Sequence, residues 1–387
     1  MLCHLRYPAR VDSLIAENEL MPTGNRQLIS YIAPAAPATR RPAIGNEPFL
    51  RPEIGFTPSW FRAATGIDFG RKWHCEPAYR QKMLPAMLGE IKRLFSGSSI
   101  GGIDNPEKPT DLLTGTYGCV GVAAIYGIPI IYAEDKWPKC ERSYLDDYQI
   151  ENLEPPDLKI NPFFQELMKQ VDWIASNEGR VEGFINFQGV LNNAYRLRGG
   201  KIFYDIIDSP QRCRHLFDCI CTTMIDAAML LHTRQLQSGV KVDFSTVSNC
   251  LVNMVSPEHY REMLLPFDQK IAETFGCIGI HNCSWNADAY IDDYASIPNV
   301  GYIDMGLDSN LVKARKAFTG ARRALVYKPT DLVNKPAEAI EADLEKIAAE
   351  YAPCDIVVGD IEADTPDERI VAFLKLCDRI NNRMENQ

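Results

Sequence analysis

The sequence lacks several features that would point to a membrane or a nucleic acid. It has no continuous run of about 18 apolar residues, so it predicts no membrane-spanning segment. Its first ten residues carry charge and proline but no apolar stretch, which argues against a secretory signal. Basic residues are outnumbered, because 41 Lys and Arg stand against 51 Asp and Glu, giving a net charge of −10. A nucleic-acid partner would need clustered basic side chains, so we expect a cytoplasmic protein with neither kind of partner.

What the chain does contain is an ordinary globular composition. Of its 387 residues, 46% are hydrophobic and 24% are charged, which supplies enough apolar side chains for a large core. The twelve cysteines are irregularly spaced and often lie in apolar stretches, as Cys219 and Cys221 do. This spacing is typical of reduced thiols inside a cell, most of them small buried residues.

The chain divides into an arm and one large domain. Residues 1–52 have no sustained periodicity and are punctuated by proline, so we expect an N-terminal extension that packs on the outside of the domain. From residue 53 onward, short apolar runs alternate with longer helical patterns, which is typical of βα units and a parallel sheet. Ser256 and Pro257 open one of these helices, as its N-cap and first residue.

The number of strands favours a closed barrel. Eight runs are expected as strands: 54–57, 128–132, 181–187, 241–246, 277–281, 300–305, 324–327 and 355–359. Strands joined by helices in one direction form either an open doubly wound sheet or a barrel. No Gly-x-Gly-x-x-Gly follows a strand, so a dinucleotide-binding sheet has little support. The prediction is an α/β fold, a (β/α)8 TIM barrel over residues 53–387.

A pair of metal-binding side chains ends the predicted strand 277–281. In a barrel, catalytic groups lie at the carboxyl ends of the strands. His281 and Cys283 are two residues apart, so on an extended chain they face the same side. An imidazole and a thiolate there are two ligands for a tetrahedral zinc. The alternative is a surface histidine beside a buried cysteine.

A catalytic zinc usually has three protein ligands and one open position. The candidates for the third ligand are Asp360, Glu362 and Cys354 around the last strand. Asp360 follows the strand directly and is preferred, with Glu362 second. Cys354 precedes the strand, roughly 15 Å away at ~3.3 Å per residue, which is too far for a bond of about 2.3 Å. The alternative for Asp360 is an acidic loop residue.

Four further residues are candidate catalytic groups. Asp304 ends the strand 300–305 and could orient either the substrate or the His281 imidazole. Asn186 ends the strand 181–187 and could hydrogen-bond a substrate. Tyr327 ends the seventh strand beside Lys328, which could neutralise a substrate carboxylate. His74 could line the pocket from an early loop, or simply belong to the start of a helix.

Several segments resemble the uroporphyrinogen decarboxylase superfamily, and their order and spacing carry the resemblance over about residues 53–380. They are residues 186–191 (NFQGVL) with 197–200 (LRGG), 238–244 (SGVKVDF), 255–260 (VSPEHY) with 264–267 (LLPF), and 280–284 (IHNCS). The last segment resembles the His-x-Cys-Gly of the methyltransferase branch. Arg62 stands alone in the N-terminal region where a decarboxylase carries arginines for its porphyrinogen.

The resemblance implies a zinc-dependent methyltransferase that works with a corrinoid protein. That branch usually has a later cysteine in a turn before Thr-Pro, whereas this chain has Asp360 in the turn before Thr365. A His/Cys/Asp site is harder and suits an oxygen-bound substrate better than a thiol. We therefore expect demethylation of a methylated or methoxylated small molecule. A metal-free lyase and a non-catalytic binding module are the alternatives. The sequence leaves the direction of methyl transfer and the oligomeric state open.

Overall fold

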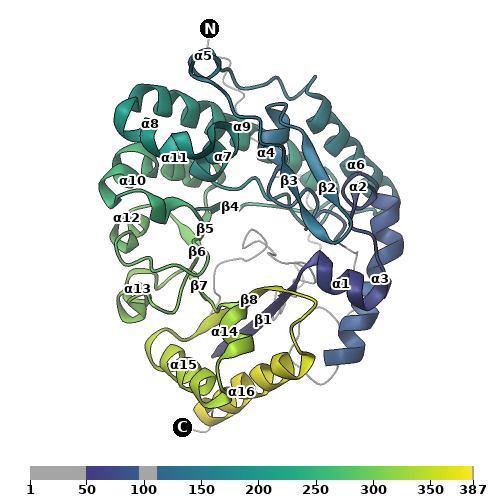
Figure 1. The fold of residues 1–387 in the computed structure, drawn as a ribbon, viewed down its shortest axis with the longest axis vertical. Coiled ribbons are helices and arrows are strands. Elements are labelled where there is room, and N and C mark those ends of the chain that lie inside the picture. The colour runs from purple at the N-terminus through teal and green to yellow at the C-terminus, as the bar shows by residue number, and fades with distance from the viewer. Residues whose placement is uncertain (1–48, 96–110, 386–387) are drawn as a thin grey trace, which may run out of the picture.

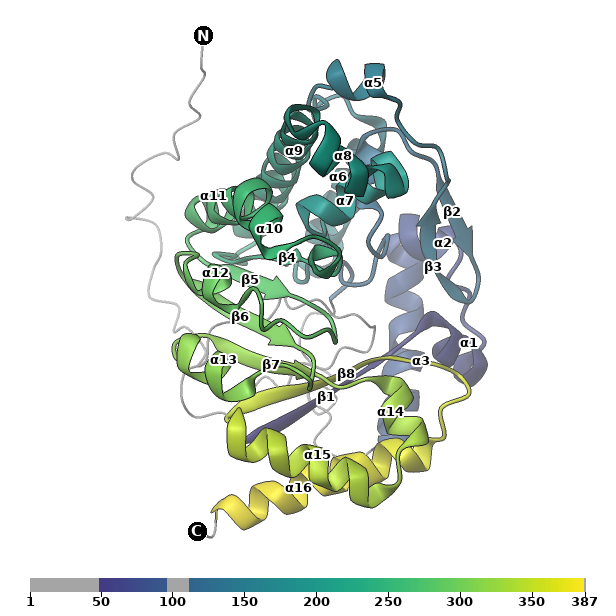
Figure 2. The same ribbon diagram turned by 60° about the vertical axis from the view of Figure 1, so that its left-hand side comes forward.

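The computed structural model describes residues 49–95 and 111–385, so nearly all of the predicted arm lies outside the described residues. The fold is the predicted α/β barrel with helices around the outside (Figure 1). Six parallel strands form one sheet in the order β1-β8-β7-β6-β5-β4, so the first strand lies beside the last. Figure 2 shows these strands side by side. They are β1 (Leu50–Phe56), β4 (Ser245–Ser248), β5 (Ile278–His281), β6 (Val300–Met305), β7 (Arg322–Val326) and β8 (Cys354–Ile361).

Two segments without regular strand pairing lie between β4 and β1. Residues 111–119 and 181–189 contact each other at Gly183, where an added Cβ would lie 1.9 Å from Asp111 Oδ1. The second segment then meets β4 at Gly189, where an added Cβ would lie 2.5 Å from the carbonyl oxygen of Ser248. The prediction of a regular strand over 181–187 was therefore wrong, although this segment does lie beside β4.

The predicted barrel strand 128–132 is also wrong. Its residues belong to β2 (Ile130–Ala133), which pairs antiparallel with β3 (Lys136–Cys140) in a separate two-stranded sheet. Ile131 is 55% exposed, so the apolar run does not enter the barrel. Periodicity alone cannot distinguish such a run from a buried strand. Glu134 and Asp135 form the turn of this hairpin.

The helices follow the predicted pattern closely. Ser256 caps α10, because its hydroxyl accepts a hydrogen bond from His259 N at 3.1 Å, with Pro257 as the first helical residue. The helices are α1 (Pro58–Thr65), α2 (Arg71–Cys75), α3 (Pro77–Phe95), α4 (Gly121–Ile125), α5 (Asp147–Glu151), α6 (Pro162–Glu178), α7 (Val190–Arg198), α8 (Ile202–Asp208), α9 (Pro210–Gln237), α10 (Pro257–Met263), α11 (Leu265–Phe275), α12 (Ile291–Ala295), α13 (Leu311–Ala317), α14 (Pro329–Asn334), α15 (Ala337–Glu350) and α16 (Asp367–Glu385).

Helix α9 is long and apolar enough to pass a length and composition test for a membrane span. However, 61% of that stretch is buried inside the fold, as in a helix of a protein core. Its burial against the neighbouring helices explains its apolar character without a membrane.

Two boundaries differ from the prediction in ways that affect the site. Strand β4 begins at Ser245 and continues to Ser248, whereas we expected residues 241–246. Strand β8 runs from Cys354 to Ile361 and therefore contains Asp360, which we expected just after the strand. Asp360 has a φ of 57°, in the left-handed region that non-glycine residues seldom adopt. The pairing of β1 with β8 shifts register opposite this position, between Ile54 and Phe56.

Buried ion pairs hold the amino-terminal end of the barrel. Arg51 of β1 donates to Asp355 at 2.7 Å, and Arg322 of β7 donates to the same carboxylate at 2.7 and 3.1 Å. Because a buried carboxylate needs partners of opposite charge, these three residues link the first, seventh and last strands.

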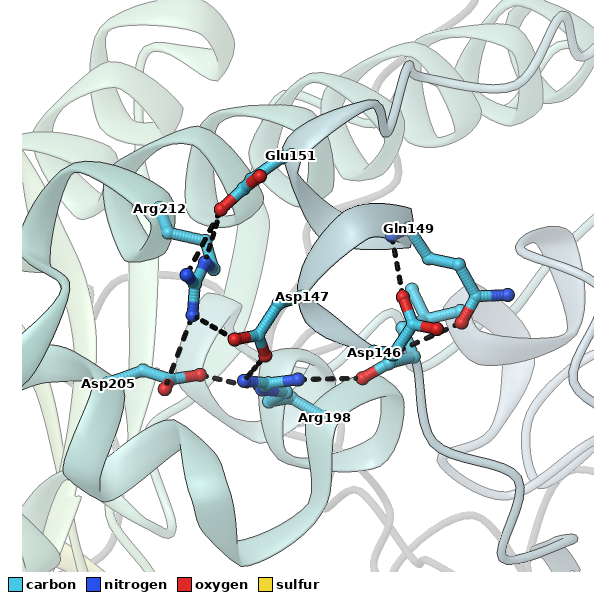
Figure 3. A network of polar contacts seen from close by, with 8 residues as sticks. Asp146, Asp147, Gln149, Glu151, Arg198, Asp205 and Arg212 are labelled. Carbon is cyan, nitrogen blue, oxygen red and sulfur yellow. Dashed lines mark hydrogen bonds and ion pairs between the residues drawn. The ribbon is translucent and has the colours of Figure 1, made fainter.

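A second ionic network links α5 to the helices α7, α8 and α9 (Figure 3). Arg198 is 3% exposed and donates to Asp205 at 2.6 Å and to Asp147. Arg212 pairs with Asp147 and with Glu151, each at 3.0 Å. Both arginines of this network are thus paired with carboxylates of the protein itself.

Candidate metal centre

The candidate centre lies where β4 and β5 end side by side. The two strands are parallel, with Ser248 opposite His281. The pairing continues one residue beyond β4, because Asn249 N donates to the carbonyl oxygen of His281 at 2.7 Å. The next residue, Cys250, is therefore brought beside the His281–Cys283 segment at the carboxyl end of the barrel.

Three side chains form a cluster here: Cys250, His281 and Cys283. Their potential ligand atoms all lie within 4.8 Å of one another. The two sulfur atoms are 3.0 Å apart, and Cys283 Sγ lies 3.1 Å from His281 Nε2. Cys283 has a left-handed backbone with φ 58°. Such conformations are held only where the surrounding structure determines them, often at functional sites.

Asp304 orients the imidazole from the neighbouring strand β6. Its Oδ2 lies 2.6 Å from His281 Nδ1, and its Oδ1 accepts from Asn282 N at 2.6 Å. Tyr302 donates its hydroxyl to Oδ2 at 2.9 Å, and the carboxylate is almost fully buried. Because Nδ1 is engaged, Nε2 is the nitrogen presented to the sulfur atoms. From the sequence, we expected Asp304 to orient either the substrate or the His281 imidazole. The structure has the contact with His281.

The electrostatics of the cluster favour charged groups. Burial alone would lower the pKa of His281, but Asp304 and the two cysteines outweigh burial and raise the pKa well above its ordinary value. The hydrogen bond between the sulfur atoms lowers the pKa of Cys250 and raises that of Cys283. These shifts favour the thiolate form of Cys250 and the protonated forms of Cys283 and His281, and a metal ion would take the place of the protons.

This donor set fits a catalytic zinc. Zinc is bound by thiolate sulfur and imidazole nitrogen, and three protein ligands leave a fourth position for water or substrate. A carboxylate on the far nitrogen of a ligating histidine is the usual support for such a site. Within residues 49–95 and 111–385, this is the only such group of three or more His, Cys, Asp or Glu side chains.

The three residues that the sequence offered as the third ligand are not members of this cluster. Asp360 is exposed and lies outside the three-residue cluster, although the charges of His281 and Cys250 reach it. The surrounding protein, together with the charge of Glu362, raises the pKa of Asp360. Glu362 turns toward the start of α1, where it accepts from Thr57 Oγ1 at 3.2 Å and from Ser59. Cys354 is buried at the first residue of β8, at the opposite end of that strand.

Three of the predicted catalytic residues are not part of the cluster. Asn186 is half-buried and accepts from Gln188 N at 2.9 Å, so it serves a turn at the end of its segment. Tyr327 donates its hydroxyl to Asp343 of α15 at 2.7 Å.

His74 is buried, and its Nδ1 accepts from Tyr117 N at 2.9 Å. It lies in the last turn of the short helix α2, whereas the alternative reading placed it at the start of the helix that begins at Pro77. Burial lowers its pKa to about 3, so it is a neutral histidine.

Sequence reasoning missed Cys250. The signal was present, because Cys250 comes three residues after the β-branched pair Thr246 and Val247, but the predicted strand ended at Thr246 and left Cys250 in a loop. It also missed Asn192 of α7, which accepts from Leu251 N at 3.1 Å and supports the Cys250 loop.

Comparison with known proteins supplies the family and the fold. A family model described as Uroporphyrinogen decarboxylase (URO-D) matches residues 108–379. No protein among those with curated descriptions matches the chain significantly. A solved structure of a methyltransferase from Methanosarcina mazei is similar, with a TM-score of 0.60 at 17% sequence identity. The match covers 84% of this chain and 92% of that one, and at this identity it supports the fold alone.

Proposed function

The chain belongs to the uroporphyrinogen decarboxylase family, and we propose that it is a zinc-dependent methyltransferase, which moves a methyl group between a small methylated substrate and a corrinoid protein. The observation that carries this proposal is the cluster of Cys250, His281 and Cys283 at the carboxyl end of the barrel. The fold of the Methanosarcina methyltransferase is consistent with it.

We propose Cys250 as the third ligand in place of Asp360. Zinc held by these residues would act as a Lewis acid on the methyl-bearing heteroatom, or hold a substrate thiol as a thiolate. Asp304 fixes the His281 tautomer, while Asn282 and Tyr302 hold the Asp304 carboxylate in place. Asp360 stays a candidate for a carboxyl group that faces the substrate from β8.

The nature of the ligands bears on the substrate. With Asp360 as a ligand, the site would be hard and would favour oxygen. Two thiolates and one imidazole make a softer site, which suits sulfur as well as oxygen. Methoxylated compounds therefore remain the predicted substrates, and methylated thiols are a second class of candidate substrate to be screened.

The corrinoid partner is proposed from the chemistry. Removing a methyl group from oxygen or sulfur requires a strong nucleophile, and a cobalt(I) corrinoid supplies it. A substrate with many carboxylates would need several free arginines. Arg62, the arginine in the region where a decarboxylase carries them, is paired with Glu134 at 2.5 Å. This observation weakens the reading of the chain as a porphyrinogen decarboxylase.

Elemental analysis of the purified protein tests the proposal. We expect about one zinc per chain in the wild type, a large loss in His281→Ala, and no loss in the control His259→Ala on α10. Methyl transfer is then followed as conversion of cob(I)alamin to methylcobalamin with methoxylated and methylthio compounds. Absence of zinc from the wild type would discard the proposal, leaving a metal-free lyase or a binding module. Zinc without methyl transfer would discard the corrinoid partner.

A further inference from the structure

A polar stripe leads from the candidate metal centre along the inner face of α7. Gln188, Asn192 and Arg196 are spaced by four residues, so in and just before a helix they lie on one side. Asn192 donates to Gln188 Oε1 at 2.8 Å, and Arg196 Nη1 donates to the carbonyl oxygen of Asn192 at 3.4 Å. Gln188 and Asn192 are buried, and Arg196 is half-buried. Buried positions of a helix are normally apolar, so this stripe needs a reason other than packing.

The stripe begins at the metal centre. Asn192 accepts from Leu251 N, the residue after Cys250. The absence of a side chain at Gly189 lets the start of α7 approach Ser248, where an added Cβ would lie 2.5 Å from the carbonyl oxygen. Gln188 has a left-handed backbone with φ 63°. The first turn of α7 is therefore fixed against the end of β4.

Arg196 lies one turn further along the helix, about 6 Å along the axis from Asn192. Its Nη2 donates to Cys119 Sγ at 2.6 Å, and Cys119 is the last residue of the segment 111–119. The charge of Arg196 also reaches Cys140, the last residue of β3. The guanidinium thus lies between the barrel and the β2–β3 hairpin.

Arg196 has no ion pair with any carboxylate of residues 49–95 and 111–385. A thiol is a weak acceptor, and a partly desolvated guanidinium gains most from a carboxylate. Arg198, two residues later on the same helix, is matched by Asp147 and Asp205 (Figure 3). The contrast within one helix indicates that the missing carboxylate of Arg196 comes from a ligand.

We propose that Arg196 binds the carboxylate of the substrate and sets its distance from the metal centre. This proposal rests on the proposed function and adds the substrate class, which is a small monocarboxylate with its methyl-bearing oxygen or sulfur at the other end. A single guanidinium fork matches one planar carboxylate, whereas a polycarboxylate would need more cations.

Calorimetric titration with matched pairs of probes tests this assignment. The charged probes are 4-methoxybenzoate and 4-(methylthio)benzoate, and the neutral ones are the corresponding benzyl alcohols. We expect the wild type to bind the carboxylates more tightly, and Arg196→Gln to weaken carboxylate binding by ~10- to 100-fold while leaving the alcohols unchanged. Arg196→Lys keeps the charge but not the fork, so we expect partial recovery. Arg214→Gln, an exposed arginine on α9, is the control and should bind as the wild type does.

Two outcomes would overturn the assignment. One is a wild type that binds the carboxylates no better than the alcohols. The other is a loss of carboxylate preference in Lys328→Gln rather than in Arg196→Gln, because Lys328 follows β7 at the carboxyl end of the barrel and is a second cation there, 3.7 Å from Asp308. Zinc content is measured on the same samples. A carboxylate preference that depends on Arg196 in a protein without zinc would discard the proposed function and keep the role of Arg196. Zinc in a protein without that preference would discard the role of Arg196 and keep the proposed function.

Discussion

The carboxylate of Asp304 lies 2.6 Å from Nδ1 of His281, and this contact determines which nitrogen of the imidazole faces the two cysteines. The two residues lie on adjacent strands, 23 positions apart in the sequence. Asp304 accepts hydrogen bonds from Tyr302 and Asn282 as well, so its own position is fixed. A buried and fully engaged carboxylate of this kind orients a metal ligand rather than binding the metal itself.

We expect Asp304→Asn to weaken zinc binding by about 10- to 100-fold. The amide would donate to Nδ1, so the proton of the neutral imidazole would move to Nε2 and block the nitrogen that faces the sulfur atoms. Competition with a chromogenic zinc chelator measures the affinity. The control is Asp292→Asn on α12, an exposed carboxylate that pairs with Lys313 at 2.8 Å. Unchanged zinc affinity in folded Asp304→Asn would contradict this role.

The third ligand is decided by comparing Cys250→Ser with Asp360→Asn. We expect Cys250→Ser to lose most of its zinc, because a serine hydroxyl is a much poorer zinc ligand than a thiolate. We expect Asp360→Asn to retain zinc, since Asp360 lies outside the three-residue cluster. Cys277→Ser, a half-buried cysteine just before β5, is the matched control. The opposite pattern, with loss only in Asp360→Asn, would restore the ligand set predicted from the sequence.

Asp268 makes stability depend on pH. Burial raises the pKa of this carboxyl from 3.8 to about 6, despite hydrogen bonds from Asn249 and Tyr260 at 2.8 Å. Below about pH 4 the group is protonated whether folded or unfolded. As the pH rises from about 4 to about 6, the folded state still holds a proton that the unfolded chain has already lost, so stability falls by on the order of 3 kcal/mol and then stays level above pH 6.

We therefore expect Asp268→Asn to gain stability relative to the wild type between pH 4 and pH 7.5. The amide oxygen can accept both hydrogen bonds, and the variant has no charge to bury. Denaturant unfolding at the two pH values gives the difference. Asp218→Asn, an exposed residue that lies 3.4 Å from Lys270, should show no such gain. An equal offset between Asp268→Asn and the wild type at both pH values would show that Asp268 does not titrate in this range.

Local sequence patterns were enough to predict the barrel and two members of the centre. Helix caps, the alternation of apolar runs with helices, and the strands β1, β5 and β6 all depend on local patterns that the chain carries within a few residues. His281 and Cys283 could be paired for the same reason, because two residues on an extended segment face one side. Asp304 was found because it ends a well-defined strand.

The other features of the site depend on contacts between residues far apart in the sequence. Cys250 is 33 residues from Cys283 in the sequence, and only the parallel register of β4 and β5 brings the two thiols together. The apolar run 128–132 could not be separated from a barrel strand until its antiparallel partner was known. Arg196 and Arg198 are the same residue type, two positions apart on one helix. One is matched by carboxylates and the other is not, because long-range packing, rather than local pattern, determines which side chains surround each charge.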